Sequence, residues 1–264
     1  GVLPGRRHAP GAAVPLPAGW QGAIDGQGRA LPAQADGGQV YAEVEAPSCG
    51  WTTLTAGKPA PAAGAVRATP TLLENDVIRV TLNAFGEFTS IWDKEANREW
   101  AAGGANILRM FQDIPSKWDA WDIDSIYRLT PVELPAPAEI RVTASGPLFA
   151  ELSVTRRLNE STMTQRIRLH RGSRRVECHT VVDWQETHKM LKVAFPVTVH
   201  ASEALHEIQY GHIKRPNHRS MPYDADRYEV SNFKWTALVE EGRGCAVLND
   251  CKYGVDVLGD TISL

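Results

Sequence analysis

The chain has 264 residues, of which 43% are hydrophobic and 22% are charged, and its 28 Lys and Arg against 31 Asp and Glu give a formal net charge of −3. This composition excludes intrinsic disorder, and no run approaches the roughly 18 apolar residues of a membrane span. The near-neutral charge argues against non-specific binding to nucleic acid or to an anionic membrane. At roughly 100–200 residues per domain, the length predicts one large domain or two unequal ones.

The first β-like segments are short and are separated by glycine-rich turns. Alternating and β-branched residues predict strands at 14–16, 40–45 and 51–54. Residues 56–70 are then dominated by Ala, Gly and Pro, a composition typical of a linker. We therefore expect three parts: part of a small β-domain at 1–57, a linker at 58–68 and a second domain at 69–264.

The strand signal is stronger in the second part of the chain. Patterns of period two predict strands at 77–82, 88–93, 152–158, 163–170 and 174–184. Around Arg166 and Arg168, cations alternate with apolar residues, which predicts one solvated sheet face. No window shows a helical period that is free of Gly or Pro. Many short strands between turns predict an all-β fold, a large antiparallel β-sandwich.

The four cysteines, Cys49, Cys178, Cys245 and Cys251, lack the spacing of a disulfide framework and include no C-x-x-C pair. We predict buried, reduced thiols, and therefore a reducing, cytoplasmic location. Because the first residue is Gly1 and not Met, the sequence leaves open whether a signal peptide has been removed. Residues 260–264 read as an interrupted strand, so we expect a fragment of a longer protein.

The segment richest in chemical groups is 113–124, which combines two tryptophans with four aspartates. Tryptophan rings cover the apolar side of sugars, and carboxylates accept hydrogen bonds from sugar hydroxyls. Paired carboxylates also serve glycoside hydrolysis. The alternative is a turn-rich loop with two packed tryptophans, and the residues alone favour that alternative. The proline and the aspartates predict a loop that leaves the sandwich, with these contact candidates: Trp118, Asp119, Trp121, Asp122 and Asp124.

A second polar segment lies at 207–218, where Gly211 and Pro216 favour a loop over a strand. His212 and His218 are predicted to be hydrogen-bonded loop histidines, because no further ligand stands at a metal-binding spacing. The sequence contains no G-x-S-x-G nucleophile elbow, P-loop or dinucleotide fingerprint.

Three separated motifs follow one another along the chain. They are Trp-Asp-Ala-Trp-Asp at 118–122, Glu-Ile-Gln-Tyr-Gly at 207–211 with Lys-Arg-Pro at 214–216, and Leu-Asn-Asp-Cys-Lys-Tyr-Gly at 248–254. With them the chain resembles glycoside hydrolase family 38, the α-mannosidases, and most nearly the cytosolic-type branch. The resemblance covers residues 69–264 as the C-terminal β-domain of the family. It implies the large sandwich also seen in galactose-mutarotase-like proteins.

The chain departs from the family pattern in two places. After Pro216 the family usually continues Thr-His-Asn-Thr-Ser-Trp-Asp, whereas residues 217–224 here read Asn-His-Arg-Ser-Met-Pro-Tyr-Asp. The family also usually has an aspartate where Ala237 stands. If these positions shape the substrate cleft, a changed aglycone preference is expected. The resemblance adds these candidates for the cleft or a domain interface: Arg215, His218 and Asp224.

The resemblance implies that the full enzyme is a retaining α-mannosidase whose zinc ligands and nucleophilic aspartate belong to an N-terminal catalytic domain. No part of this chain resembles that domain, so we expect no catalytic residue and no metal ligand here; zinc is implied for the full-length enzyme only. The chain is expected to support the catalytic domain and to line its cleft. The expected partners are that domain and a mannose-containing oligosaccharide or mannoside, not nucleic acid or a membrane, with a homo-oligomer left open.

Two other classes of protein stay open. A stand-alone sugar epimerase of mutarotase type needs an acid and a base on either side of a sugar ring, and His179, His206 and Glu207 are the available groups. The other class is a non-catalytic carbohydrate-binding or interaction module. An epimerase would interconvert sugar anomers as this chain alone, whereas a supporting domain would not.

Overall fold

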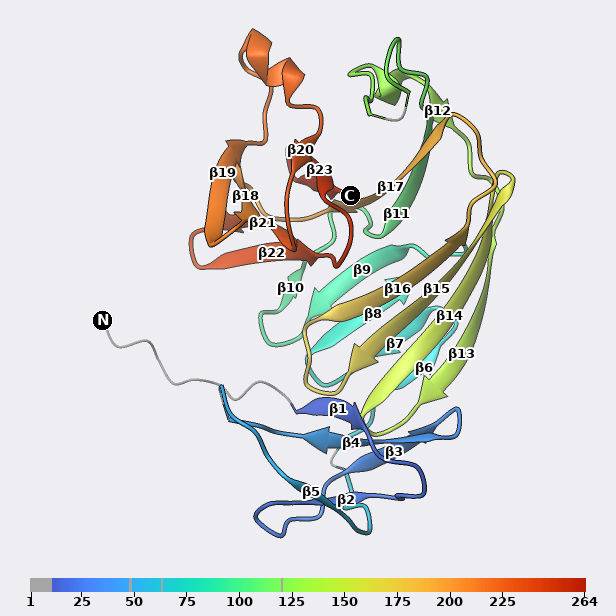
Figure 1. Ribbon diagram of the computed structural model, residues 1–264, viewed down its shortest axis with the longest axis vertical. Coiled ribbons are helices and arrows are strands. Elements are labelled where there is room, and N and C mark those ends of the chain that lie inside the picture. Colours follow the sequence, from blue (N-terminus) through green and yellow to red (C-terminus); the bar gives the residue numbers. More distant parts are fainter. Residues whose placement is uncertain (1–10, 48, 63, 120) are drawn as a thin grey trace. The chain divides into compact units, whose positions relative to one another are not determined.

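The computed structural model describes residues 11–47, 49–62, 64–119 and 121–264 (Figure 1). In this part of the chain the only helical segments are two 3-10 turns, η1 (Tyr127–Leu129) and η2 (Pro222–Asp226). The strand pairs with a defined register are antiparallel. The prediction of an all-β, antiparallel fold is therefore confirmed. Among the described residues, no helix has the length and apolar content needed to cross a bilayer.

The chain forms two compact units, and the long strands of one sheet contribute residues to both. The first unit contains the residues up to Arg79 together with Ile140–Val154 and Gln165–Thr180. The second unit contains Val80–Glu139, Thr155–Thr164 and Val181–Leu264. The predicted domain limits at residues 57 and 69 stay a prediction.

Two small sheets open the first unit. One has the strand order β1-β4-β3 and the other pairs β2 with β5. Gly37 and Gly38 both have positive φ in the tight turn between β3 and β4, a conformation that glycine adopts without a steric penalty. The predicted strands at 14–16 and 40–45 overlap β1 and β4, and the third prediction meets β5 at Leu54. The bounds are β1 (Ala12–Pro15), β2 (Ala23–Asp25), β3 (Ala33–Asp36), β4 (Gln39–Val44) and β5 (Leu54–Ala56).

A buried glutamine joins the three-stranded sheet to residues much later in the sequence. The amide of Gln34 donates from Nε2 to the carbonyl of Phe149 (3.0 Å), and its Oε1 accepts from the backbone N–H groups of Leu148 (2.9 Å) and Phe149 (3.0 Å). The ring of Tyr41 meets the ring of Phe149 edge-on at 5.4 Å. Both residues lie in the first unit, which these contacts help to hold together.

Two larger sheets follow, with strand orders β10-β9-β8-β7-β6 and β13-β14-β15-β16. The prediction at 88–93 matches β9, and the one at 163–170 lies within β15. The bounds are β6 (Arg67–Thr69), β7 (Leu72–Glu74), β8 (Ile78–Leu82), β9 (Phe88–Asp93), β10 (Arg98–Glu99), β13 (Ala138–Ser145), β14 (Phe149–Leu158), β15 (Ser161–His170) and β16 (Val176–Asp183).

The cation-bearing face of β15 is only partly solvated. Ile167 is buried and Arg166 is exposed, as the alternation predicts. Arg168 is half-buried, because its guanidinium pairs with Glu151 at 2.8 Å and lies 4.2 Å from the centre of the Phe149 ring. The period of two therefore gives the correct face, and local ion pairs and ring contacts cover part of it.

The second unit has two sheets of its own, with strand orders β12-β11-β17-β24-β23-β20 and β19-β18-β21-β22. Each joins strands that are far apart in sequence; for example, β17 lies between β11 and β24. The bounds are β11 (Ile107–Gln112), β12 (Pro131–Val132), β17 (Lys189–Pro196), β18 (Glu203–Ile208), β19 (Gly211–Pro216), β20 (Val230–Ser231), β21 (Trp235–Glu240), β22 (Arg243–Leu248), β23 (Gly254–Leu258) and β24 (Thr261–Ser263).

The predicted loop at 207–218 is wrong. Most of this segment is a β-hairpin, in which β18 pairs with β19 around a turn that contains Tyr210 at φ +63°. Gly211 and Pro216 are the first and last residues of β19, which is an edge strand. At the ends of an edge strand, a glycine or proline removes few inter-strand hydrogen bonds, so neither residue prevents strand formation.

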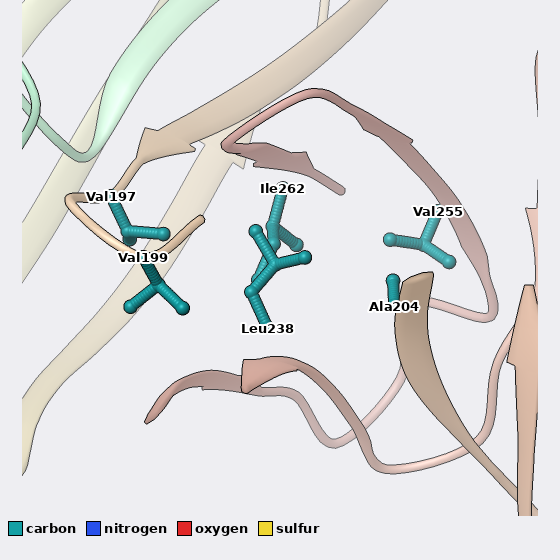
Figure 2. Packing of buried hydrophobic residues seen from close by; sticks show 6 residues of the cluster. All are labelled: Val197, Val199, Ala204, Leu238, Val255 and Ile262. Atoms are coloured by element: carbon teal, nitrogen blue, oxygen red, sulfur yellow. The ribbon is translucent and has the colours of Figure 1, made fainter. Parts of the chain in front are cut away.

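One buried hydrophobic cluster of the second unit joins residues from its two sheets. Figure 2 shows Leu238 of β21 and Ile262 of β24 pointing toward one another, with the valines before β18 on one side. Burial of such aliphatic side chains supplies roughly 1.5–3 kcal/mol each. The cluster is Val197, Val199, Ala204, Leu238, Val255 and Ile262.

The predicted burial of the cysteines is also wrong. Cys49, Cys178 and Cys251 are exposed, and Cys245 is half-buried. Cys178 lies on β16, at the edge of its sheet, and Cys251 lies in the turn before β23. Burial here depends on the position of the strand in the sheet, which residue type alone does not reveal.

Candidate functional site

The Trp–Asp loop, defined as the described residues of 113–124, follows β11 and forms neither helix nor strand, as predicted. Its base is closed by a backbone hydrogen bond from Gln112 N–H to the carbonyl of Thr130 (2.9 Å). Trp118 has φ +60°, and its carbonyl accepts from the N–H groups of Trp121 (2.7 Å) and Asp122 (3.0 Å). The side chains of Trp118 and Trp121 are 73% and 90% exposed. The turn thus presents both indole rings to solvent.

Three ionisable groups gather at the base of the Trp–Asp loop. Nδ1 of His188, in the turn before β17, lies 3.4 Å from Oδ1 of Asp119. Within the described residues, Oδ1 of Asp113 is buried without a hydrogen-bond partner. Burial raises the pKa of Asp113, and the nearby Asp119 carboxylate raises it further. His188 was not a sequence candidate, because nothing in its local pattern indicates contact with a loop far earlier in the chain.

The other two aspartate candidates act mainly on the loop itself. The Asp122 carboxylate accepts from the backbone N–H of Ile123 (3.0 Å). The carbonyl of Asp124 accepts from the N–H of Tyr127 (3.0 Å), the first residue of η1. Short polar side chains that bond nearby backbone groups are typical of turns. Asp122 acts in this way, whereas Asp124 contributes its backbone carbonyl.

A second loop, the 217–229 segment, contains η2 and is organised by one buried carboxylate. Asp224 is 4% exposed, and its Oδ2 accepts from the backbone N–H groups of Ser220 (3.1 Å) and Met221 (2.8 Å). Its Oδ1 accepts from the guanidinium of Arg227 (2.8 Å). Asp224 therefore shapes the segment.

The remaining two candidates lie at the start of that segment and just before it. His218 is exposed, and its Nδ1 lies 2.9 Å from the hydroxyl of Ser220. Arg215, on β19, donates from Nη1 to the carbonyl of Ser231 (3.0 Å). Burial lowers the pKa of Arg215, and Arg227 lowers it further.

The structure brings the two loops together. The hydroxyl of Tyr228 donates to the carbonyl of Ile123 at 2.6 Å. In Figure 1 the turns η1 and η2 both lie at the upper end of the view, at the same end of the second unit. We call the exposed side of the two loops the two-loop surface. Besides the tryptophans it includes these exposed apolar side chains: Ile114, Met221 and Tyr223.

A buried ionic cluster anchors both loops to the six-stranded sheet. The Glu229 carboxylate, from the second loop, pairs with the ammonium of Lys192 on β17 and accepts from the Tyr127 hydroxyl at 3.2 Å. Arg128 of η1 pairs with Asp256 on β23. Burial raises the pKa of Glu229 although Lys192 opposes the shift, and burial raises the pKa of Tyr127 to about 12. Sequence analysis missed these residues, because they come from four separate segments.

The donor set for a metal is absent from the described part of the chain. No three His, Cys, Asp or Glu side chains there form a group suited to hold a metal ion. Tetrahedral zinc sites need three or four such ligands converging on one point. The described residues therefore do not fit a zinc site, and we derive no chemical step through zinc from them.

The architecture is shared with solved structures of larger enzymes. A protein in glycosyl hydrolase family 38 from Enterococcus faecalis superposes with a TM-score of 0.70 at 16% identity, over 92% of this chain and 34% of that one. An α-mannosidase from Enterococcus faecalis V583 gives a TM-score of 0.71 at 15% identity, over 96% of this chain and 34% of that one. These likenesses define the class of fold, a large antiparallel β-sandwich, which in those two structures forms part of a longer chain.

The sequence then assigns the family. Residues 73–264 match the C-terminal domain of glycosyl hydrolases family 38, and the chain belongs to this family. Over 197 residues it is 40% identical to alpha-mannosidase 2C1 of Homo sapiens, covering 73% of this chain and 19% of that protein. It is 35% identical over 201 residues to alpha-mannosidase G of Dictyostelium discoideum, covering 73% and 18%. The chain thus spans about a fifth of the length of these relatives, and the predicted resemblance is confirmed.

Proposed function

We propose that this chain is a non-catalytic C-terminal part of a retaining α-mannosidase that hydrolyses terminal α-mannosides. Its relatives bear the name alpha-mannosidase, and it matches the C-terminal domain of their family. In the proposal, nucleophile and zinc reside in an N-terminal catalytic domain. The proposal gives the Asp119 and Asp122 carboxylates no catalytic role: Asp119 lies beside His188, and Asp122 accepts a hydrogen bond within the loop.

The two-loop surface is proposed to contact that catalytic domain and to line its cleft. The observation that carries the proposal is the exposure of Trp118 and Trp121 on a loop whose backbone is held by hydrogen bonds. Exposed apolar patches mark interaction sites, and large aromatic rings dominate the energetics of interfaces. Packing against the catalytic domain is favoured over direct contact with sugar.

The first experiment concerns activity. Purified as this chain alone, the protein is expected to show no turnover of an aryl α-mannoside, with or without added zinc. The reason is that the proposal places nucleophile and metal ligands elsewhere. Release of the aryl group, followed by absorbance, is the measurement, and the full-length enzyme is the positive control. Turnover that disappears in Asp119→Ala or Asp122→Ala would instead put a catalytic dyad in the Trp–Asp loop.

The second experiment separates packing from sugar contact. In this chain alone, Trp121→Ala should change stability by less than about 0.5 kcal/mol, because the side chain is 90% exposed. In the full-length enzyme, packing predicts a lower melting temperature and a cost of about 3–5 kcal/mol, typical of a buried tryptophan. Sugar contact predicts weaker turnover at an unchanged melting temperature.

A matched control for Trp121 is Trp51→Ala, since Trp51 is 79% exposed and belongs to the first unit. We expect Trp51→Ala to leave turnover unaffected. If Trp121→Ala alters neither melting temperature nor kinetics in the full-length enzyme, both versions of the proposal for this loop are wrong.

The geometry gives little support to a stand-alone epimerase. His206 is buried, with its Nδ1 3.2 Å from the hydroxyl of Thr236, and the Glu207 carboxylate accepts from the backbone N–H of Lys234 at 2.6 Å. Groups occupied in this way are poor candidates for an acid and a base facing a sugar ring. A cytoplasmic location remains part of the proposal, and the free thiols of Cys178, Cys245 and Cys251 are consistent with it.

A further inference from the structure

A small polar cavity of about 130 Å³ opens on the six-stranded sheet of the second unit. Two of its lining cations stand directly opposite one another on neighbouring strands, Arg109 on β11 and Lys192 on β17. Like charges in opposite positions of a β-ladder destabilise the pair. The other lining residues are Phe111, Tyr127, Arg128, Asp256, Leu258, Thr261 and Ser263.

The charges around this cavity do not balance. Lys192 pairs with Glu229, and Arg128 pairs with Asp256. In the described part of the chain, the guanidinium of Arg109 has neither an ion-pair partner nor a hydrogen-bond partner. Three cations against two carboxylates leave one excess positive charge, which is on Arg109, an exposed residue of β11.

We propose that this cavity binds a small oxyanion, a phosphate group, held between Arg109 and Lys192 with the hydroxyls of Thr261 and Ser263 as further donors. A guanidinium binds phosphate through two parallel hydrogen bonds. The volume is well below the roughly 300–1,000 Å³ of pockets for larger ligands, so the cavity suits a phosphate group and not an oligosaccharide.

Two sources of the group share this chemistry, inorganic phosphate and the phosphate of a hexose phosphate. Neither depends on the role proposed for the two-loop surface. The test is isothermal titration of this chain with inorganic phosphate, with a hexose 6-phosphate and with the neutral hexose. Thermal melting in phosphate and in chloride at matched ionic strength runs in parallel.

We expect phosphate to raise the melting temperature more than chloride does, and the neutral hexose not to bind. Arg109→Met should weaken phosphate binding at least about tenfold, which corresponds to ~1.4 kcal/mol, and should remove the extra stabilisation. Arg109→Lys should bind phosphate with intermediate affinity, because lysine keeps the positive charge but lacks the two parallel N–H donors of a guanidinium. Arg166→Met, at an exposed arginine on β15, is the matched control and should behave as the unmodified chain does.

In phosphate-free buffer Arg109→Met should melt no lower than the unmodified chain, since it relieves a like-charge pair. Tighter binding of the hexose phosphate would identify a sugar phosphate as the ligand, whereas equal or tighter binding of inorganic phosphate would identify the free ion. The proposal is overturned if phosphate stabilises no more than chloride does, or if Arg109→Met responds to phosphate as Arg166→Met does.

Discussion

Replacing Lys192 with methionine is expected to destabilise the second unit by about 3–5 kcal/mol at neutral pH, the cost of removing one partner from a buried ion pair. Lys192 is 5% exposed and pairs with Glu229, which the Tyr127 hydroxyl also contacts. Methionine fills a similar volume but leaves the carboxylate buried without its cation. Denaturant unfolding of the purified chain at pH 7.5 measures the loss.

The cost of Lys192→Met should also depend on pH. Burial already raises the pKa of Glu229, and removal of the opposing ammonium raises it further. As the pH falls toward 5, the carboxyl can take up a proton in place of its lost partner, so the destabilisation becomes smaller.

Two comparisons test that interpretation. The double variant Lys192→Met with Glu229→Gln should recover much of the stability at pH 7.5, because no buried charge is left unpaired. Lys214→Met is the surface control, since Lys214 pairs with Glu203 at 3.9 Å and both side chains are more than half exposed. Its cost should stay below about 1 kcal/mol. If Lys192→Met also costs less than about 1 kcal/mol, the ionic cluster does not anchor the two loops.

Much of the fold could be predicted from local patterns. The strand at 88–93 matches β9, and the alternation along β15 identifies its buried face, because side chains on a strand alternate between the two faces of the sheet. The Trp–Asp loop was recognisable from Pro115 and its aspartates, which favour turns. These features depend on neighbours in sequence.

The features that sequence reasoning missed depend on partners far along the chain. Glu229 is 37 residues from Lys192 and 102 from Tyr127, and Arg128 is 128 residues from Asp256. No spacing rule connects such positions before the strand order is known. The hairpin at 203–216 was missed for a different reason: β19 is an edge strand, where Gly and Pro are tolerated.

Stability is expected to fall as the pH drops from about 6.5 to about 4, and His206 is the cause. This histidine is 1% exposed on β18, and burial lowers its pKa from 6.5 to about 4, with a smaller contribution from Arg215. Its Nδ1 lies 3.2 Å from the hydroxyl of Thr236. With the Asn232 amide nitrogen facing backbone carbonyls, the Asn232 oxygen accepts from that hydroxyl at 2.9 Å, so the hydroxyl can accept from a neutral His206.

The sign follows from the two protonation states. Below pH 6.5 the unfolded chain binds a proton at this histidine, while the folded chain stays neutral there until about pH 4. As the pH falls from 6.5 to 4, protonation therefore stabilises the unfolded state relative to the folded state. Below about pH 4 both states bind the proton, and the difference no longer grows. At ~1.4 kcal/mol per unit of pKa, the loss amounts to about 3 kcal/mol.

Denaturant unfolding at pH 7, 5.5 and 4.5 would measure this slope. His206→Gln retains a hydrogen-bonding side chain without a group that titrates, so the slope should become flatter by the contribution of one proton. His212→Gln is the matched control, because His212 lies exposed on the neighbouring strand β19 and should leave the slope unchanged. If His206→Gln and the unmodified chain lose stability in parallel between pH 6.5 and 4.5, His206 is not the group responsible. The carboxylates whose pKa values are lowered in the folded state would then have to carry the acid sensitivity, and their effect lies at lower pH.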